Sequence, residues 1–276
     1  MPSLSTDVDA QWVSFARTVR SERSHVLIAC LEGQARVSSR LGQHDVDRGG
    51  WLLLTGRGGV VVRCDPGVQM LVAGADVTGQ CAGLGVPFPA AGALPIEVVA
   101  KLRQDGAGLG VEAFEFLLAE LLWPLLDGVG RCPGRTLDRR RQIFARLQTA
   151  RMFLAGHLEH LPSLNEVAAL ANLSRCYFVR AYAGVYGVPP IEDHQGMRMR
   201  RAAHLLTHSD LSIGEIALRC GFDAGCNFAR AFRHANGTTP TAWREREKPC
   251  AQPMTHRATT HAGATRSDLG TLARSA

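Results

Sequence analysis

The feature that most constrains the fold is an internal duplication in the C-terminal half of the chain. Three segments recur: Phe178–Tyr182 as Phe228–Phe232 and Gly187–Pro190 as Gly237–Pro240, both 50 residues later, and Leu164–Ala168 as Ile213–Ala217, 49 residues later. Matching segments in register indicate two copies of one small unit. The change of offset predicts one residue inserted in the turn of the second copy.

Each copy carries the signals of a helix-turn-helix. Ser163 and Ser212 each precede a Glu by three residues, the capping-box pattern of a helix start. Turn residues follow at 172–174 and 221–223, and we expect Ser174 and Asp223 to cap the next helices. The apolar residues expected to face a core are Leu164, Val167, Ala168 and Leu170 in the first copy, and Ile213, Ile216, Ala217 and Leu218 in the second.

The second helix of each copy is the candidate reader of the DNA major groove. Helical spacing predicts a buried face in each, formed by Phe178, Ala181, Tyr182 and Val185 and by Phe228, Ala231, Phe232 and Ala235. By elimination the opposite faces are exposed. The candidate DNA-binding residues are Ser174, Arg175, Cys176, Val179, Arg180, Gly225, Cys226, Asn227, Arg230 and Arg233.

The types of these residues suit base recognition. Arginine can bond guanine through two donors, asparagine can do so with adenine, and valine can touch a thymine methyl group. A solvated or capping role is the alternative for Arg180 and Arg230. For Cys176 and Cys226 the alternatives are a thiol sensor, whose oxidation would weaken DNA binding, and small residues tolerated at variable contact positions.

Residues 190–208 between the copies predict a connecting helix. Met197, Leu205 and Leu206 are expected to face inward, and Arg198, Arg200 and Arg201 outward. At about 1.5 Å per residue such a helix spans roughly 25–30 Å. One turn of B-DNA is about 34 Å, so two readers could enter successive major grooves.

Charge is segregated in the same direction. Residues 1–130 carry 10 Lys/Arg against 14 Asp/Glu, whereas residues 131–248 carry 18 against 10. A basic half beside an acidic half indicates that one part of the chain faces a polyanion. The eight cysteines form no C-x-x-C pair, and no cysteine–histidine cluster has zinc-ligand spacing. The sequence therefore predicts no metal site and no cofactor.

The C-terminal segment resembles the AraC/XylS family of bacterial transcription regulators. The resemblance rests on residues 212–217 (SIGEIA), 220–222 (CGF), 228–232 (FARAF) and 237–244 (GTTPTAWR). It implies a seven-helix domain with two helix-turn-helix units. After Gly187–Pro190 the family has an aromatic and then an aliphatic residue, where this chain has Asp193 and His194, and Gly196 lies early in the linking helix.

The N-terminal half predicts short strands. Residues 25–30, 34–38, 50–55, 60–63 and 68–72 are rich in β-branched and apolar residues, with glycine and proline between them. This spacing favours an all-β barrel or sandwich. A loop is expected over 79–95, helices over 96–104 and 111–126, an interdomain joint at 131–135 and a disordered tail from Pro249.

The family resemblance implies a layout for this half, in which a cupin-like β-barrel binds a small effector and the following helices dimerise. A metal-dependent cupin enzyme would need a His-x-His pair with a following Glu, where this chain has only isolated His25 and His44. The expected fold class is α+β. The expected domains are a cupin-like effector-sensing domain over 1–108, a helical dimerisation segment over 109–136, an AraC-type DNA-binding domain over 137–248 and a tail over 249–276.

The expected function is sequence-specific DNA-binding transcription regulation without catalytic residues. The resemblance implies promoter DNA, RNA polymerase, a small effector and a second copy of the chain as partners, and it favours activation. No membrane span and no secretory signal are visible, which favours a cytoplasmic protein. The alternative is an AraC-like domain fused to a DNA-repair methyltransferase-type or thiol-sensing module. The repair module would need four clustered cysteines or a Pro-Cys-His site, whereas the chain has Arg131-Cys-Pro-Gly134.

Overall fold

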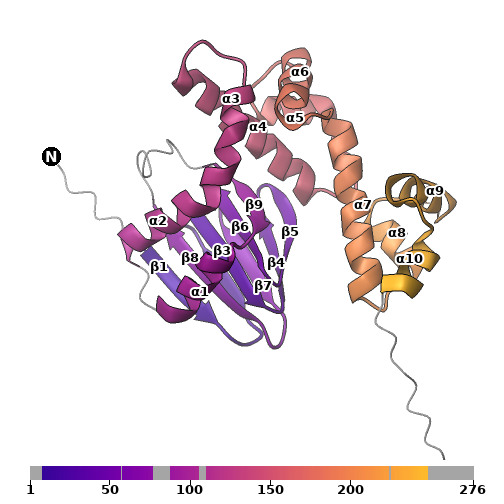
Figure 1. The fold of residues 1–276 in the computed structure, drawn as a ribbon, viewed down its shortest axis with the longest axis horizontal. Coiled ribbons are helices and arrows are strands. Elements are labelled where there is room, and N and C mark those ends of the chain that lie inside the picture. The colour runs from indigo at the N-terminus through magenta and orange to yellow at the C-terminus, as the bar shows by residue number, and fades with distance from the viewer. Residues whose placement is uncertain (1–7, 57, 77–87, 106–109, 224, 248–276) are drawn as a thin grey trace, which may run out of the picture.

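The computed structural model describes residues 8–56, 58–76, 88–105, 110–223 and 225–247 of the 276-residue chain. An N-terminal β-sheet region is followed by helices only (Figure 1). The expected tail from Pro249 lies outside the described residues. No helix in the described part of the chain is long and apolar enough to cross a membrane.

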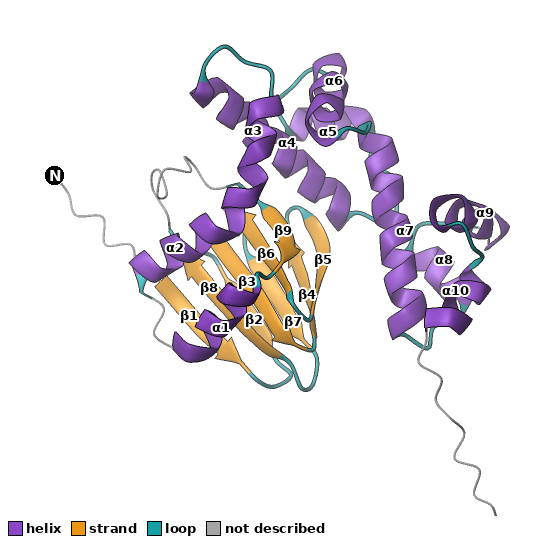
Figure 2. Cartoon of the chain, in the orientation of Figure 1, coloured by secondary structure: helices purple, strands orange, loops and turns teal. Residues whose placement is uncertain are grey.

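Two antiparallel sheets face each other in the N-terminal region (Figure 2). The five-stranded sheet has the order β1 (Val8–Val13), β8 (Gln69–Ala75), β3 (His25–Glu32), β6 (Gly50–Thr55) and β9 (Ala90–Ala93), and the four-stranded sheet has the order β2 (Thr18–Ser21), β7 (Val60–Cys64), β4 (Gln34–Ser39) and β5 (Gly42–Asp47). Among the described residues no strand pairing joins the two sheets. The region is therefore a sandwich of open sheets, one of the two arrangements that the strand spacing favoured, and no closed barrel is seen in the described part of the chain.

The five-stranded sheet is buried on both faces, which explains its continuous apolar strands. Along β3, Ile28 and Cys30 point into the core between the sheets, while Leu27 and Ala29 point to the outer face. Side chains alternate between faces in a strand, so an uninterrupted apolar run requires two partners. The second partner is a layer of helices.

Two helices, α1 (Ile96–Asp105) and α2 (Val111–Leu122), cover the outer face of the five-stranded sheet (Figure 2). The apolar face of α2 is formed by Phe114, Leu117, Leu118, Leu121 and Leu122, all buried in one cluster with the sheet. The leucine-rich face of the expected dimerisation helix therefore packs against the sheet of the same chain. Phe116 and Trp123 remain exposed, at 49% and 67%. The chain then passes through a short 3₁₀ helix, η1 (Trp123–Leu126), and α3 (Asp127–Arg131).

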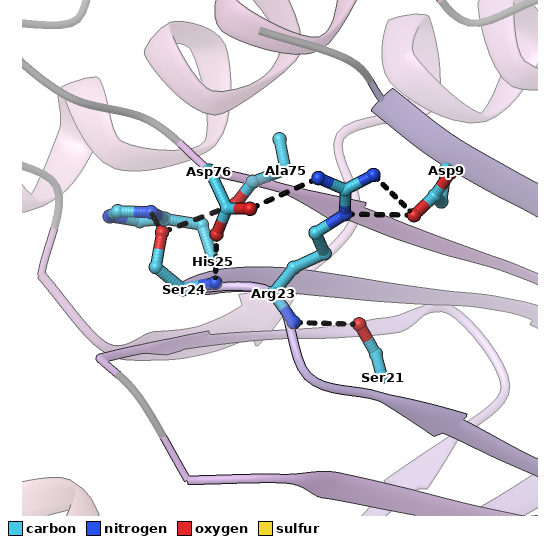
Figure 3. A network of polar contacts seen from close by, with 7 residues as sticks. All are labelled: Asp9, Ser21, Arg23, Ser24, His25, Ala75 and Asp76. Carbon is cyan, nitrogen blue, oxygen red and sulfur yellow. Dashed lines mark hydrogen bonds and ion pairs between the residues drawn. The ribbon is translucent and has the colours of Figure 1, made fainter.

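A polar network fastens the N-terminal strand to the sheet (Figure 3). Arg23 lies between two carboxylates, with Nε 2.8 Å from Asp9 and Nη1 3.0 Å from Asp76. The amide of Ser24 also donates to Asp76, at 2.8 Å. His25 Nδ1 is 2.9 Å from the Ser24 hydroxyl.

Among the described residues no cluster of three His, Cys, Asp or Glu side chains could hold a metal ion.

The helical half consists of α4 (Leu137–Gly156), α5 (Leu164–Leu170), α6 (Arg175–Tyr186), α7 (Pro190–His208), α8 (Ile213–Arg219), α9 (Gly225–Asn236) and α10 (Pro240–Glu247). The core around α4, α5 and α6 is continuous with the outer core of the sheet. The core of α8 and α9 against the second half of α7 is a separate cluster. The first unit is thus built onto the β region, and the second is joined to it through α7.

Candidate nucleic-acid interface

The two copies fold as two helix-turn-helix units, although α9 begins at Gly225 rather than directly after the expected cap Asp223. Both capping boxes form: the Ser163 and Ser212 hydroxyls accept from the amides of Glu166 and Glu215, whose carboxylates accept from the serine amides. The turns place Asn172 at φ 51° and Gly221 at φ 72°, so equivalent positions 49 residues apart adopt the same left-handed backbone. Helix α6 begins three residues after that position and α9 four, which places the inserted residue in the second turn.

The turn of each unit is held by an arginine from the helix that precedes it. Arg146 on α4 donates to the carbonyl of Asn172 at 3.3 Å. Arg198 on α7 donates to the carbonyls of Cys220 and Gly221 and lies over the Phe222 ring, 4.2 Å from its centroid. The outward orientation expected for Arg198 was therefore wrong, because turn carbonyls without helical partners need a donor. Burial lowers the pKa of Arg198 from its ordinary value.

Two further expectations about the cores need correction. Leu170 is 40% exposed and Leu218 is 62% exposed, although both were expected to face a core. Helices α5 and α8 are only 7 residues long, so each presents just one narrow buried face, formed by Val167 and Ala168 or by Ile216 and Ala217. Ala235 on α9 is also exposed rather than buried.

Asp193 and His194, which depart from the family pattern, are both buried, and both side chains form hydrogen bonds. The Tyr182 hydroxyl donates to Asp193 Oδ2 at 2.8 Å, and Arg151 Nε donates to the same oxygen at 2.9 Å. His194 Nε2 donates to the carbonyl of His157 at 3.0 Å, which ties the α4–α5 connection to α7. Burial raises the pKa of Asp193, but the hydrogen bonds from Arg151 and Tyr182 outweigh it and hold the pKa below its ordinary value.

The second unit makes the corresponding contacts with different chemistry. Fifty residues after Tyr182 and Asp193 stand Phe232 and Trp243, whose rings meet edge to face with centroids 5.7 Å apart. Arg244, 50 residues after His194, donates to the carbonyl of Leu211 at 2.6 Å and ties the α7–α8 connection. The first unit therefore has the hydrogen bond from Tyr182 to the Asp193 carboxylate where the second unit has the aromatic pair Phe232–Trp243. This hydrogen bond compensates for the departure of Asp193 from the family pattern.

The predicted DNA-contact residues form two sets, one on α6 with its N-cap and one on α9. Nine of the ten are exposed, and Val179 is half-buried against the core. Ser174 is the N-cap residue of α6, but its side chain makes no capping hydrogen bond, contrary to expectation. Among the described residues no ion pair joins Arg175, Arg180 or Arg230 to a carboxylate.

One residue near the second reader was not singled out as a DNA contact from the sequence. Arg200 on α7 lines a hollow of about 630 Å³ between α7 and α9, together with Asn227 and Arg230. The sequence predicted Arg200 to face outward, and it is exposed. Only the packing of α9 on α7 brings it beside the candidate reading face.

Comparison with known proteins agrees with this architecture. A family model described as "Helix-turn-helix domain" matches residues 167–246. The HTH-type transcriptional activator RhaR of Enterobacter sp. is 38% identical over 157 residues, 56% of this chain and 55% of that protein. The MmsAB operon regulatory protein of Pseudomonas aeruginosa is 32% identical over 94 residues, 34% of this chain and 31% of that protein. The chain thus spans about a third to just over half of these relatives.

A solved DNA-binding domain is similar to the same part of the chain. The domain of AdpA, a global transcriptional factor solved in complex with a target DNA, is 31% identical, covers 37% of this chain and 91% of its own, and has a TM-score of 0.35. The relatives named above are regulators rather than enzymes, which leaves the repair-enzyme alternative without support. The helix-turn-helix region over residues 167–246 is thus of the kind found in AraC/XylS-family DNA-binding transcription regulators.

Proposed function

We propose that the chain binds promoter DNA sequence-specifically through both helix-turn-helix units. The observation that carries this proposal is the pair of exposed faces on α6 and α9, joined by the 19-residue helix α7. At about 1.5 Å per residue α7 spans roughly 28 Å, close to one turn of B-DNA. Both faces carry exposed arginines for which the described part of the chain provides no carboxylate partner, and these support contact with phosphates and guanines.

The second unit is proposed to supply most of the sequence discrimination. Its exposed face carries Asn227 and Arg230, which have the donors to read adenine and guanine. The first unit offers Cys176 and Val179, and Val179 is half-buried. Arg180 remains the strongest candidate for a base contact there.

The regulatory part of the proposal rests on the family. We propose activation with RNA polymerase as partner, in response to a small effector held by the N-terminal region, and action as a homodimer in the cytoplasm. The curated relative of highest identity cited above is named an activator. Because α2 buries its apolar face against the sheet, we propose that a second copy contacts the exposed side of α2 and the adjoining η1, where Phe116 and Trp123 lie.

A DNA mobility-shift assay tests the DNA proposal. The full chain should shift a fragment from its own upstream region, and Arg230→Ala should cost about 1–3 kcal/mol, roughly 5- to 150-fold, on that fragment. The loss on random DNA should be small, and Arg139→Ala, on the first turn of α4, serves as a control on the same domain. Equal losses on both DNAs would reduce Arg230 to a phosphate contact, and no shift at low salt would refute the proposal.

A further inference from the structure

A cleft of about 1080 Å³ lies where the helical half meets the sheet edge. One side is formed by β5, and the other by α4, α7 and the end of α8. The centre of the space between the two sheets, by contrast, is filled: Ile28, Leu52 and Met70 are at most 1% exposed there. A smaller hollow of about 550 Å³ lies between β1, β8 and β2. The cleft at the junction therefore offers a small molecule more room than that hollow.

The two sides of the cleft are held together by closely fitting backbones and one inserted side chain. Gly156 at the end of α4 lies directly on the β4–β5 turn, where an added Cβ would come 2.1 Å from the carbonyl oxygen of Leu41. His44 Nε2 donates to the carbonyl of Met152 at 3.0 Å, and Met152 itself is buried in the core between the sheets. These contacts fix α4 against β5, whereas the wall formed by α7 and α8 belongs to the separate core of the second unit.

Positive charge is in excess along the cleft. Asp45, 9% exposed, pairs with two guanidiniums at once, those of Arg36 at 2.9 Å and Arg201. Arg219 at the end of α8 adds a third guanidinium, and within the described part of the chain no carboxylate pairs with it. Burial, together with the nearby charges of Arg36 and Arg219, lowers the pKa of Arg201 from its ordinary value. An anion in the cleft would relieve this repulsion.

Three buried polar atoms of the cleft residues have no partner within the described structure. They are Nδ1 of His44, Nδ1 of His204 and Oδ1 of Asp47. Because His44 Nε2 donates to a carbonyl, and burial lowers the pKa of His44 to about 4, its Nδ1 carries a bare lone pair. His204 Nε2 lies 3.1 Å from Asp47 Oδ2, so in the neutral ring the Nδ1 of His204 also carries a lone pair without a donor. Bare acceptors of this kind require hydroxyl or N–H donors.

We propose that this cleft binds a small hydroxylated organic oxyanion, held by the guanidiniums of Arg201 and Arg219 and by hydroxyl groups that donate to His44 and His204. The inference rests on the proposed function, because it locates the effector and names its chemical class. The oxyanion is a carboxylate or a phosphate, both of which match the fork of arginine donors. The hydroxyls distinguish this ligand from a simple inorganic anion.

Occupancy of the cleft would act on the second reading unit. Arg201 and His204 lie on α7, whose Met199, Leu205 and Leu206 pack with α8 and α9 in one core. A ligand that bridges β5 to Arg201 and Arg219 therefore contacts both walls and sets the position of α7 and α8 against the sheet. The binding free energy is in this way linked to the placement of α9.

Binding to the full chain is measured by calorimetry with four probes at constant ionic strength. Gluconate and glucose 6-phosphate carry both features, whereas glucose lacks the anion and succinate lacks the hydroxyls. We expect gluconate or glucose 6-phosphate to bind at least 10-fold more tightly than glucose and succinate, and the stronger of the two identifies the carboxylate or the phosphate. Binding of neither hydroxylated anion, or equal binding of all four probes, would overturn the inference.

Matched variants localise the site. Arg219→Gln and Arg201→Gln should each weaken the preferred probe at least 10-fold, and Arg219→Gln leaves no carboxylate unpaired, so it keeps the fold. Arg139→Gln and Arg230→Gln, which lie outside the cleft, should leave probe binding unchanged. Loss of binding in Arg230→Gln but not in Arg219→Gln would place the anion on the DNA-facing surface and overturn the inference.

The mobility-shift assay separates the two proposals. A chain that shifts DNA but binds none of the probes retains the proposed function and loses only this site. A chain that binds gluconate or glucose 6-phosphate through Arg219 but shifts no DNA retains the site and loses the function.

Discussion

The hydrogen bond between Tyr182 and Asp193 is the contact that lets the first unit depart from the family pattern. Tyr182→Phe removes one of the donors to a carboxylate whose side chain is only 6% exposed. A hydrogen bond to a charged group contributes about 1.5–3 kcal/mol. Arg151 remains on the same oxygen at 2.9 Å, so we expect a loss in the free energy of unfolding near the lower end, about 1.5–2 kcal/mol.

A double-mutant cycle isolates this contact. Urea unfolding of the full chain, followed by helix circular dichroism, is compared for wild type, Tyr182→Phe, Asp193→Asn and the double variant. We expect a coupling energy of about 1–2 kcal/mol at neutral pH, since the two residues touch. Tyr186→Phe is the matched control: its hydroxyl bonds neutral Gln148 at 2.8 Å, so its effect should be about 1 kcal/mol and nearly additive with Asp193→Asn.

The coupling should depend on pH in a defined direction. The pKa of Asp193 is below its ordinary value in the folded state, so its contribution is present above the unfolded value of about 3.9. It is lost as pH falls through the lower folded pKa. Additive effects of Tyr182→Phe and Asp193→Asn at neutral pH would refute the reasoning, because the coupling energy between the two side chains would then be zero.

Three further perturbations test the junction and the turns. Gly221→Ala should destabilise the second unit by at least about 2 kcal/mol in urea unfolding, because the position has φ 72° and an added Cβ would lie 2.3 Å from the carbonyl of Glu159; an unchanged midpoint would contradict this. Gly156→Ala should loosen α4 from the Leu41 turn, seen as amide exchange that is faster than in the wild type in β5 but unchanged in β3. Exchange in β5 equal to that of the wild type would count against the close contact. Burial lowers the pKa of His44 to about 4, whereas the pKa in the unfolded state is near 6.5, so the unfolded state takes up the proton first as the pH falls. The free energy of unfolding of the wild type should therefore decrease between about pH 6.5 and 4, by roughly 3 kcal/mol more than that of His44→Gln. Identical pH profiles of the two proteins would refute this prediction.

The helical half was predicted closely because its signals are local. The duplication, the capping boxes and the turn residues gave both units, and the connecting helix expected over 190–208 is α7, Pro190–His208. The errors there concern side chains whose surroundings come from another element. Arg198 is buried because α8 and its turn bring carbonyls to it, and Leu218 is exposed because α8 is too short to bury a second face.

The β region was predicted less completely for a physical reason. The five expected segments are strands, but β1, β2, β5 and β9 were missed. All four lie at sheet edges, where one side faces solvent or another element and the apolar signal is weak. β5, for example, reads Gly-Gln-His-Asp-Val-Asp and buries only His44 and Val46. β9 falls inside the segment expected to be a loop.

The sequence by itself determined which regulators the chain resembles, since the duplicated motif consists of local signals that can be recognised without the rest of the fold. Only the tertiary structure decided how the halves meet. The contact between His44 and Met152 joins residues 108 positions apart, and no periodicity links a polar edge strand to the end of a distant helix. That junction places Asp45 against Arg201 and leaves the basic cleft beside α7. The two readers are therefore set by local sequence, and their position relative to the sheets by packing that forms only when the whole chain folds.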